Sequence, residues 1–310
     1  MHILVTGGAG FIGSNFVHYM LETYDDVQLT TLDALTYAGS RENLEEALDT
    51  PRHRFIEGDI CDRELVSDLV EVVDFIVNFA AESHVDRSIK NSTPFVETNV
   101  EGTQVLLDEA VDAEIDRFLQ VSTDEVYGEI LDGAFSETDA LDPRNPYAAT
   151  KAGADLLVKS YEETYGLPAV ITRTCNNFGP RQHQEKLIPK LIRNAVRGDP
   201  LPIYGDGSNV REWIYVDDNC RALDRVLRTG ESGDVYNVGT GEEKTNLDVA
   251  KTIVDAVGAD REQITFVEDR PGHDQRYALD TSKLTGMGWE PSWSFDQGIS
   301  QTIEYYRPMN

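Results

Sequence analysis

Short apolar runs rich in β-branched residues alternate with longer segments of helical periodicity through the first part of the chain. The apolar runs predict strands at His2–Thr6, Val27–Asp33, His53–Glu57, Asp74–Ala80, Arg117–Ser122 and Pro168–Arg173. The segments between them predict helices near residues 14–24, 41–49, 62–72, 94–113 and 147–165. Strands that alternate with helices in this way predict a doubly wound α/β fold, with a parallel sheet covered by helices on both faces.

The pattern becomes less regular after about residue 180, where Pro and Gly recur at short intervals. This change predicts a smaller, C-terminal lobe of mixed α/β structure beside the sheet. Because no low-complexity linker separates the two parts, we expect the lobes to interleave along the chain. The sequence assigns residues 1–179, with returning segments at about 210–243 and 300–310, to the first lobe, and about 180–209 and 244–299 to the second.

Acidic residues dominate the charge of the chain. The 310 residues include 56 Asp and Glu against 27 Lys and Arg, which gives a formal net charge of −29. A field of this sign repels phosphate backbones and anionic lipid headgroups, so binding to nucleic acid or to a membrane surface is disfavoured. Carboxylates spread along the whole chain, with few lysines, favour a protein adapted to a high-salt cytoplasm, where ions screen self-repulsion. An ordinary acidic enzyme is the alternative.

Targeting and metal-binding signals are weak in this sequence. No apolar run reaches the roughly 18 residues of a membrane span, and the chain opens directly into the strand-like HILVT without a signal-peptide pattern. We therefore expect a cytoplasmic protein. The three cysteines, Cys61, Cys175 and Cys220, are far apart and the six histidines form no cluster, so no metal site is expected.

A glycine-rich turn follows the first predicted strand and opens the first predicted helix. It contains a GxGxxG motif that starts at Gly8 and is preceded by Gly7. Glycines in this context allow a tight turn and a close approach of the backbone to a pyrophosphate, while the helix N-terminus supplies free N–H groups. The turn predicts a Rossmann-type dinucleotide site, to which we assign Gly7, Gly10, Phe11, Ile12 and Gly13.

Two acidic residues at the ends of the next strands complete this site. Asp33 ends the second strand, 20 residues after Gly13, where its carboxylate can accept hydrogen bonds from a ribose and repel a 2′-phosphate. No Arg follows it immediately, so NAD is favoured over NADP. Asp59 and Ile60 follow the third strand, where Asp59 can meet the adenine edge.

A Tyr–Lys pair lies at helical spacing well after the glycine turn. Tyr147 and Lys151 follow an Asn-Pro turn and share one face of the predicted helix, because positions i and i+4 are neighbours. The Lys151 ammonium can favour the phenolate of Tyr147 electrostatically. A phenolate beside a nicotinamide can take a hydroxyl proton while a hydride leaves the same carbon.

Two adjacent carboxyl groups, those of Asp124 and Glu125, follow Thr123 just beyond the strand at 117–122. The carboxyl ends of parallel strands face the ligand crevice of an open sheet, so we expect these side chains beside the redox centre. Oxidation of a sugar at carbon 4 acidifies the proton on carbon 5. One carboxylate can remove that proton, and one carboxylic acid can protonate the hydroxyl that leaves carbon 6.

These motifs together resemble one group of enzymes. The chain is similar over essentially its whole length to the extended short-chain dehydrogenases/reductases, and among them to the nucleotide-sugar 4,6-dehydratases. Phe178 and Glu212 depart from the Tyr and Asp usual in that family, which affects fine substrate contacts rather than the reaction. The resemblance is carried by TGGAGFIGS, LDALTYAGS, NFAAESHVDRSI, STDEVYG, NPYAATKA, RTCNNFGPRQHQEKLIP, LPIYGDGSNVREWIYV and EDRPGHDQRYALD.

The resemblance implies a role for each matching residue. Thr123 would bind the carbon-4 oxygen, Asp124 would be the acid at carbon 6 and Glu125 the base at carbon 5. Tyr147 would be the redox base, supported by Lys151. The implied NAD site gains Ala80, Ala81, Ser83, Thr98 and Asn176, beside Tyr147 and Lys151. The nucleotide sugar would be held by Ser83, Thr123, Asn177, Lys186, Leu187, Pro202, Tyr204, Arg211, Asn246, His273, Arg276 and Tyr277.

The implied reaction is the conversion of dTDP-glucose to dTDP-4-keto-6-deoxy-glucose, with NAD returned unchanged. The alternatives are UDP-glucose as the substrate, a UDP-sugar 4-epimerase or decarboxylase, and a non-catalytic NAD-binding protein. The pair Asp124 and Glu125 counts against an epimerase or a decarboxylase, since neither needs a 5,6-elimination. The resemblance also implies a homodimer joined through helices near 94–113 and 147–165, and it leaves the final deoxysugar open, rhamnose included.

Overall fold

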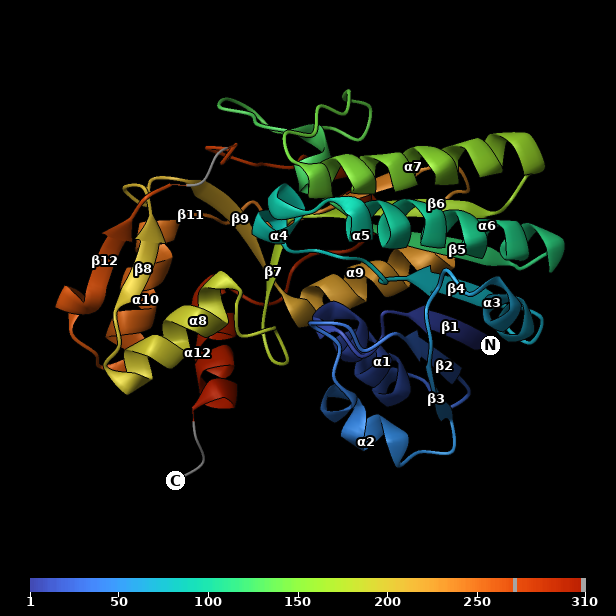
Figure 1. Cartoon of the computed structure of the whole chain (residues 1–310), viewed down its shortest axis with the longest axis horizontal. Helices are drawn as coiled ribbons and strands as arrows, with labels where there is room; N and C mark the ends of the chain where they lie inside the picture. Colours follow the sequence, from blue (N-terminus) through green and yellow to red (C-terminus); the bar gives the residue numbers. More distant parts are fainter. Residues whose placement is uncertain (270–271, 308–310) are drawn as a thin grey trace.

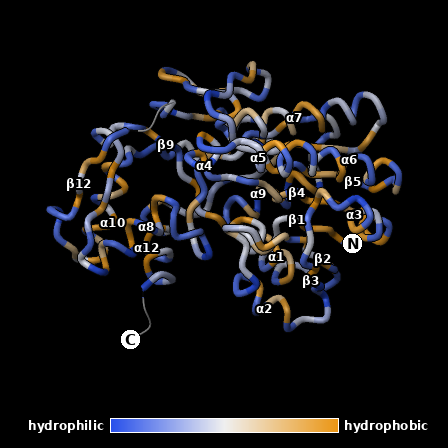
Figure 2. Tube along the Cα trace, viewed as in Figure 1, coloured by the Kyte–Doolittle hydropathy of each residue, from blue (hydrophilic) through white to orange (hydrophobic). Residues whose placement is uncertain are grey.

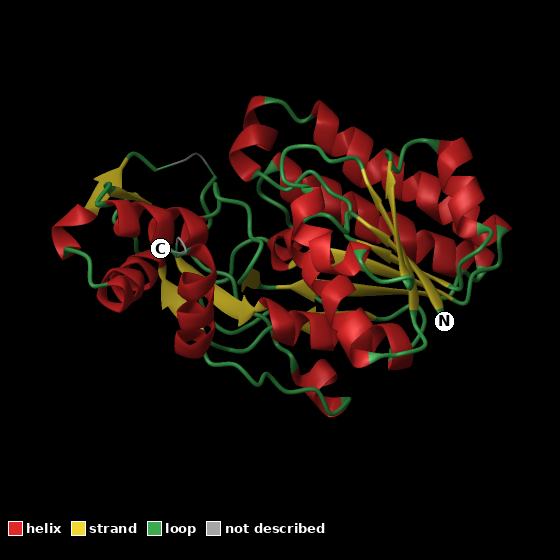
Figure 3. Ribbon diagram, turned by 90° about the horizontal axis from the view of Figure 1, so that it is seen from below, coloured by secondary structure: helices red, strands yellow, loops and turns green. Residues whose placement is uncertain are grey.

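A seven-stranded parallel sheet forms the larger part of the molecule (Figures 1 and 3). The computed structural model describes residues 1–269 and 272–307. The strand order is β10-β6-β5-β4-β1-β2-β3, and every neighbouring pair is parallel. The predicted doubly wound α/β fold is confirmed, with β10 as a strand that the sequence analysis does not predict. The strands are β1 (His2–Thr6), β2 (Gln28–Asp33), β3 (His53–Glu57), β4 (Phe75–Asn78), β5 (Arg117–Thr123), β6 (Ala169–Thr174) and β10 (Val235–Val238).

Helices cover both faces of this sheet. α1 and α9 pack together on one face, where Phe16 and Leu223 are fully buried, and α3, α6 and α7 cover the other, with Leu106 in its core. Figure 2 shows hydrophilic residues predominating along the outer loops. The helical segments are α1 (Phe11–Thr23), η1 (Arg41–Leu44), α2 (Glu45–Leu48), α3 (Arg63–Val70), α4 (Val85–Lys90), α5 (Thr93–Val96), η2 (Glu97–Gly102), α6 (Thr103–Asp112), η3 (Asp124–Tyr127), α7 (Pro146–Tyr165), α9 (Val216–Thr229) and α11 (Ser282–Gly286).

Local signals fix the position of α7, the helix that carries the Tyr–Lys pair. The Asn145 side chain accepts a hydrogen bond of 2.9 Å from a backbone N–H of the first turn, and Pro146 occupies the first helical position. The helix ends before Gly166, whose φ of 71° suits a residue without a β-carbon. The cap fixes where the helix begins and therefore the positions of Tyr147 and Lys151 on it.

The predicted helix at 94–113 contains a π-helical turn, η2, between α5 and α6. The buried side chain of Asn99 lies in this turn. Its Oδ1 accepts a hydrogen bond from the Glu82 N–H (2.8 Å), and its Nδ2 donates to the Glu82 carbonyl (3.0 Å) and to the Thr150 hydroxyl (2.9 Å). π turns are rare and often lie at functional sites. This one ties the loop after β4 to α7.

A smaller lobe of mixed α/β structure lies beside the main sheet. Its three-stranded sheet has the order β11-β9-β7, with β9 antiparallel to β11 and parallel to β7, and β8 pairs with β12 in parallel. Helices α8, α10 and α12 pack around a separate apolar core. The elements are β7 (Asn176–Phe178), α8 (Leu187–Arg197), β8 (Leu201–Tyr204), β9 (Val210–Tyr215), β11 (Glu243–Thr245), α10 (Asn246–Val257), η4 (Arg261–Gln263), β12 (Ile264–Val267) and α12 (Phe295–Tyr306).

The last helix corrects one part of the predicted lobe division. α12 packs against α8 and α10 and buries Phe295 and Ile303 in the core of the smaller lobe. Residues 300–306 therefore belong to that lobe, whereas the sequence assigns 300–310 to the larger one; residues 308–310 lie outside the described residues. The apolar spacing of a helix predicts that it packs against a hydrophobic core, but it does not show which lobe that core belongs to. Strands β7 and β9, which the sequence assigns to the larger lobe, also belong to the sheet of the smaller lobe, and α11, which it assigns to the smaller lobe, packs against β10 of the main sheet.

Two kinds of feature are absent from the described ranges 1–269 and 272–307. No helix there is long and apolar enough to cross a membrane. Nor does this part of the chain bring together three or more His, Cys, Asp or Glu side chains that could hold a metal ion.

Candidate active site

A cleft lies along the carboxyl ends of the main-sheet strands, where the strand order reverses between β1 and β4. Ligands bind at such a switch point in open α/β sheets. Thr123, Asp124 and Glu125 line this cleft, so the structure brings the proposed catalytic groups to the proposed cofactor site. Every residue that the sequence assigns to NAD lines it as well: Gly7, Gly10, Phe11, Ile12, Gly13, Asp33, Asp59, Ile60, Ala80, Ala81, Ser83, Thr98, Tyr147, Lys151 and Asn176.

The glycine turn leaves bare backbone where a side chain would collide. Gly7 has a φ of 65°, and a Cβ there would lie 2.6 Å from the Ala80 nitrogen. A Cβ at Gly13 would lie 2.5 Å from the Gly7 carbonyl oxygen. Gly10, Phe11 and Ile12 at the start of α1 line the cleft, where a helix N-terminus can bind a pyrophosphate.

We expect Gly7→Ala to destabilise the protein and abolish dinucleotide binding. The left-handed backbone is unfavourable for a residue with a β-carbon, and the collision is with main-chain atoms that no side-chain rotation can relieve. The free energy of unfolding in urea should fall by at least about 2 kcal/mol. Gly133→Ala is the matched control, since Gly133 has a φ of 80° and a Cβ added there would have no neighbour within 4 Å. Equal losses in the two variants would contradict a role for the collision.

The Asp33 carboxylate is held in place at the end of β2. Oδ2 accepts a hydrogen bond from the Ala9 N–H (2.9 Å), and Oδ1 accepts one from the Leu35 N–H (2.8 Å). Burial raises the pKa of this carboxyl. A carboxylate offers about four acceptor positions, so Asp33 keeps capacity for the hydroxyls of a ribose. The position suits the role that the sequence assigns to it.

The acidic pair lies where β5 ends and η3 begins. The Thr123 hydroxyl accepts a hydrogen bond from the Glu125 N–H (3.3 Å) and donates one to Asp124 Oδ1 (3.1 Å). Asp124 is buried, and its Oδ2 has no hydrogen-bond partner within the described part of the chain. Burial, followed by the charges of Glu125 and Glu212, raises the pKa of Asp124 well above its ordinary value. This shift favours the protonated form of Asp124, the form that can donate a proton.

One amide connects Glu125 to the helix that carries Tyr147. Asn145 Nδ2 donates to Glu125 Oε2 (3.2 Å), while its Oδ1 caps α7. The Tyr147 N–H donates to the Ser88 hydroxyl (3.3 Å), and the Tyr147 ring packs edge-on against Phe95 with 6.4 Å between centroids. These contacts hold the proposed base and the proposed redox group in a fixed relation.

Burial dominates the electrostatics of Tyr147 and Lys151. Lys151 Nζ donates to the Val121 carbonyl (2.7 Å), and burial lowers the pKa of Lys151 to about 8. Burial raises the pKa of Tyr147 well above its ordinary value, and the charge of Glu125 adds to the rise. Burial and the acidic neighbours of Tyr147 therefore favour the neutral phenol.

The residues assigned to the nucleotide sugar fall into two groups. Asn177 and Lys186 line the cleft together with Ser83 and Thr123, and Lys186 Nζ donates to the Ser83 carbonyl (2.9 Å). The others do not line the cleft and lie on the smaller lobe and the segment that returns from it: Leu187, Pro202, Tyr204, Arg211, Asn246, His273, Arg276 and Tyr277.

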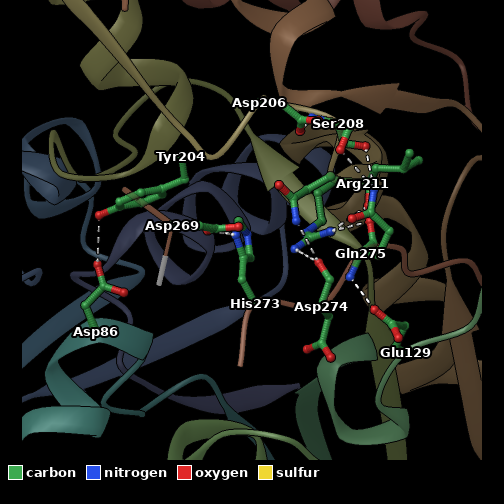
Figure 4. A network of polar contacts seen from close by, with 12 residues as sticks. Asp86, Glu129, Tyr204, Asp206, Ser208, Arg211, Asp269, His273, Asp274 and Gln275 are labelled. Carbon is green, nitrogen blue, oxygen red and sulfur yellow. Dashed lines mark hydrogen bonds and ion pairs between the residues drawn. The ribbon is translucent and has the colours of Figure 1, made fainter. Parts of the chain in front are cut away.

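Arg211 and Tyr277 lie close to the acidic pair. The Arg211 guanidinium stacks over the Tyr277 ring, 4.4 Å from its centroid, and donates to the Asp274 carbonyl (2.9 Å; Figure 4). The charge of Arg211 opposes the rise in the pKa of Asp124. Burial, followed by the charge of Glu125, raises the pKa of Tyr277. Both side chains therefore interact electrostatically with the acidic pair, although neither lines the cleft.

Arg276 is already paired with an acid. Its guanidinium forms a two-point ion pair with Glu243, with both N···O distances at 2.6 Å, and donates to the Gly133 carbonyl (2.9 Å). A diphosphate would have to displace Glu243 before Arg276 could bind it, a competition that the resemblance does not reveal.

His273 and Tyr204 form part of a contact between the lobes. The His273 ring is 2.6 Å from Asp269 through Nδ1 and packs edge-on against Tyr204, with 6.1 Å between centroids. Figure 4 shows the Tyr204 hydroxyl directed at Asp86 of α4, to which it donates at 3.4 Å. Tyr204 therefore approaches the larger lobe at α4, and neither residue lines the cleft.

The cleft is also lined by residues that the sequence analysis does not assign. Glu82 lies between two assigned residues, and Tyr37 lies within the LDALTYAGS motif. Both follow a predicted strand closely, and this position could have indicated that they line the cleft. Gln182 and His183 belong to a loop whose course only the fold shows. The additional lining residues include Thr36, Tyr37, Glu82, Val121, Cys175, Gln182 and His183.

Comparison with known proteins agrees with this geometry. The family model described as GDP-mannose 4,6 dehydratase matches residues 4–302. The low-salt glycan biosynthesis protein Agl12 of Haloferax volcanii is 68% identical over 306 residues, 99% of this chain and 98% of that protein. A dTDP-glucose 4,6-dehydratase of an Actinoplanes species is 49% identical over 313 residues, 99% and 98% of the two chains. The crystal structure of the dTDP-glucose 4,6-dehydratase DesIV of Streptomyces venezuelae, with NAD bound, matches with a TM-score of 0.97 and 51% identity, over 99% of this chain and 97% of that one.

Proposed function

Because the chain belongs to the GDP-mannose/dTDP-glucose 4,6-dehydratase family of extended short-chain dehydrogenases/reductases, we propose that it converts dTDP-glucose to dTDP-4-keto-6-deoxy-glucose with a bound NAD. The observation that carries the proposal is the buried Asp124 next to Glu125, in the same cleft as Tyr147, where burial raises the pKa of Asp124. An epimerase needs the redox base but no acid for a departing hydroxyl. A dehydratase needs both.

The first step is the oxidation of carbon 4. The residues around the glycine turn and Asp33 fit NAD, which when bound accepts a hydride from carbon 4 and delivers it later to carbon 6. Tyr147 takes the proton of the carbon-4 hydroxyl, and the Thr123 hydroxyl can donate to the same oxygen. Tyr147 has to be ionised for this step. The positive charge of an oxidised nicotinamide ring beside it would lower the pKa of Tyr147.

The second step is the loss of water across carbons 5 and 6. Glu125, held by the Asn145 amide, removes the acidified proton of carbon 5. Asp124 gives its proton to the hydroxyl that leaves carbon 6 and becomes a carboxylate. A proton is afterwards returned to carbon 5. The proton that Tyr147 took from the carbon-4 hydroxyl balances the one that Asp124 gave to the departing hydroxyl. The sugar therefore loses one water in total.

The test of this proposal is incubation of the protein at high salt with dTDP-glucose and, separately, with UDP-glucose. The alkaline absorbance of a 4-keto sugar and the product mass are followed together. We expect a product lighter by one water from dTDP-glucose alone. Product from UDP-glucose alone would keep the mechanism and change the substrate, which is the second candidate. A sugar change without a mass change would overturn the dehydratase in favour of an epimerase.

The acidic surface supports adaptation to a high-salt cytoplasm, as does the likeness to a Haloferax protein. Glu45, Glu46 and Asp49 are all exposed on or beside α2, and the formal net charge is −29. Screening of this repulsion should raise the midpoint of thermal unfolding by about 5–10 °C between low and molar potassium chloride. A neutral osmolyte at equal osmolality is the control for solute exclusion. Equal midpoints at both salt concentrations would contradict the adaptation.

A homodimer is supported by apolar side chains left exposed on the predicted interface helices. Val96 of α5 is 49% exposed, and Leu156 and Tyr165 of α7 are 59% and 60% exposed. Exposed apolar patches often mark association surfaces. Light scattering should give twice the chain mass, and Leu156→Glu should shift the protein toward the monomer. Phe266→Glu is the control, since Phe266 is 57% exposed on β12 of the smaller lobe. A monomeric parent protein would contradict the dimer.

A further inference from the structure

Side chains from three separate segments meet at one side of the proposed NAD cleft. Tyr37 comes from the loop after β2, Ser83 from the loop after β4, and His183 from the loop that leads to α8 of the smaller lobe. All three line the cleft. The proposed chemistry gives no role to Tyr37 or His183, so their meeting needs another explanation.

The phenol ring of Tyr37 is the centre of these contacts. Its hydroxyl lies 2.9 Å from Ser83 Oγ. The Arg87 guanidinium stacks over the ring at 4.3 Å from the centroid, and His183 packs edge-on against it with 5.5 Å between centroids. One side chain of the cofactor-binding lobe is thus held by the loop after β4, by α4 and by the smaller lobe.

Polar contacts beside the ring join the same two lobes. Arg87 forms an ion pair with Glu185 (2.9 Å), and Lys186 Nζ donates to the Ser83 carbonyl (2.9 Å). A single exposed ion pair contributes little. Here the cation that stacks on Tyr37 also pairs with the loop that supplies His183, so these contacts act together. The loop at 182–186 is therefore attached to the larger lobe across the cleft.

The proposed reaction makes retention of the cofactor necessary. The hydride removed from carbon 4 has to be returned to carbon 6 of the same sugar. If the cofactor left between the two steps, the dehydrated sugar could not be reduced. We propose that Tyr37, Arg87 and His183 form a clamp that closes the cleft over the bound dinucleotide and slows its release. The inference rests on the proposed function, since only a cofactor that is regenerated in place has to be retained.

The experiment measures the rate at which NAD leaves the protein. The full chain is loaded with NAD, freed of excess by rapid desalting and diluted, and the NAD that remains bound is determined over time. We expect Tyr37→Ala to release NAD about tenfold faster than the parent protein, and His183→Ala to change the rate in the same direction. Tyr37→Phe keeps the ring and loses only the contact with Ser83, so its release should be about two- to threefold faster.

Two further readouts separate a clamp from a loss of structure. If both residues act on the same ring contact, the double variant Tyr37→Ala/His183→Ala should release NAD no faster than Tyr37→Ala alone. Turnover of Tyr37→Ala should decline with time and be restored by added NAD, which a misfolded protein would not show. Phe266→Ala is the matched control, because Phe266 is an exposed aromatic of β12 (57%) and does not line the cleft.

Unchanged NAD release in both Tyr37→Ala and Tyr37→Phe would overturn the clamp. Because release is measured without a sugar, the result does not depend on the proposed reaction. If release responds as expected while neither sugar nucleotide is dehydrated, the proposed function fails and the clamp stands. If dehydration is normal while release is unchanged, only the clamp fails.

Discussion

Asparagine in place of Asp124 is expected to stop the loss of water while leaving the oxidation of carbon 4 intact. The variant keeps the shape of the side chain and removes the proton that the departing hydroxyl needs. Overall turnover should fall by about 10²–10⁴-fold, the usual contribution of a positioned acid. The absorbance of the reduced cofactor should then appear once per site and persist, which a defect in the first step would not produce.

The pKa of Asp124 gives this prediction a second check. Since burial raises that pKa, the acid form is present below it, and dehydration by the parent enzyme should decline as the pH rises through it. The ionised form is disfavoured in the fold, so Asp124→Asn should not lower the unfolding temperature at neutral pH. Asp112→Asn, at an exposed position at the end of α6, is the control. Unchanged turnover in Asp124→Asn would remove Asp124 from the mechanism.

Phenylalanine in place of Tyr147 is expected to abolish the reaction at its first step. The change removes only the hydroxyl that accepts the carbon-4 proton, so turnover should fall by at least about 10²-fold, and no reduced cofactor should appear after sugar is added. The ring contact with Phe95 and the hydrogen bond from the Tyr147 N–H do not depend on the hydroxyl, so the fold should be retained.

Binding of NAD distinguishes a chemical role of Tyr147 from a structural one. Tyr147→Phe should hold as much NAD as the parent protein, because the glycine turn and Asp33 are untouched. Tyr305→Phe, on an exposed side chain of α12, is the matched control for loss of a phenol hydroxyl. A variant at Tyr147 that still reduced its cofactor at the parental rate would show that another group is the redox base.

The cofactor site could be predicted from the sequence because local rules determine it. A strand followed by a glycine turn, an acid at the end of the next strand and a Tyr–Lys pair one helical turn apart all depend on neighbours along the chain. The fold then brings strand ends together in the same way for any open parallel sheet. Gly7 and Asp33 therefore line the cleft as expected.

Other features depend on partners distant in sequence, and no local pattern reveals them. Glu243 pairs with Arg276 because the segment after β12 returns beside β9 and β11, and Tyr37 meets His183 because the loop that leads to α8 folds back on the larger lobe. The sign of the pKa shift of Tyr147 is a further case, since it follows from burial among acids rather than from the position of Lys151. Charge and spacing in the sequence identify the candidate catalytic residues, whereas burial in the fold determines the direction of their pKa shifts.

The π-helical turn at 97–102 has a consequence for how this enzyme can change over evolutionary time. Each residue of a helix advances the direction of its side chains by about 100°. Deleting one residue within the turn would therefore rotate Asn99 relative to the apolar face of α6, and either the amide would lose Glu82 and Thr150 or Leu106 would leave the core. Substitutions at its exposed positions, Glu97 and Glu101, can accumulate, whereas insertions and deletions should be rejected. The length of the segment, more than its composition, should be inherited unchanged among related enzymes.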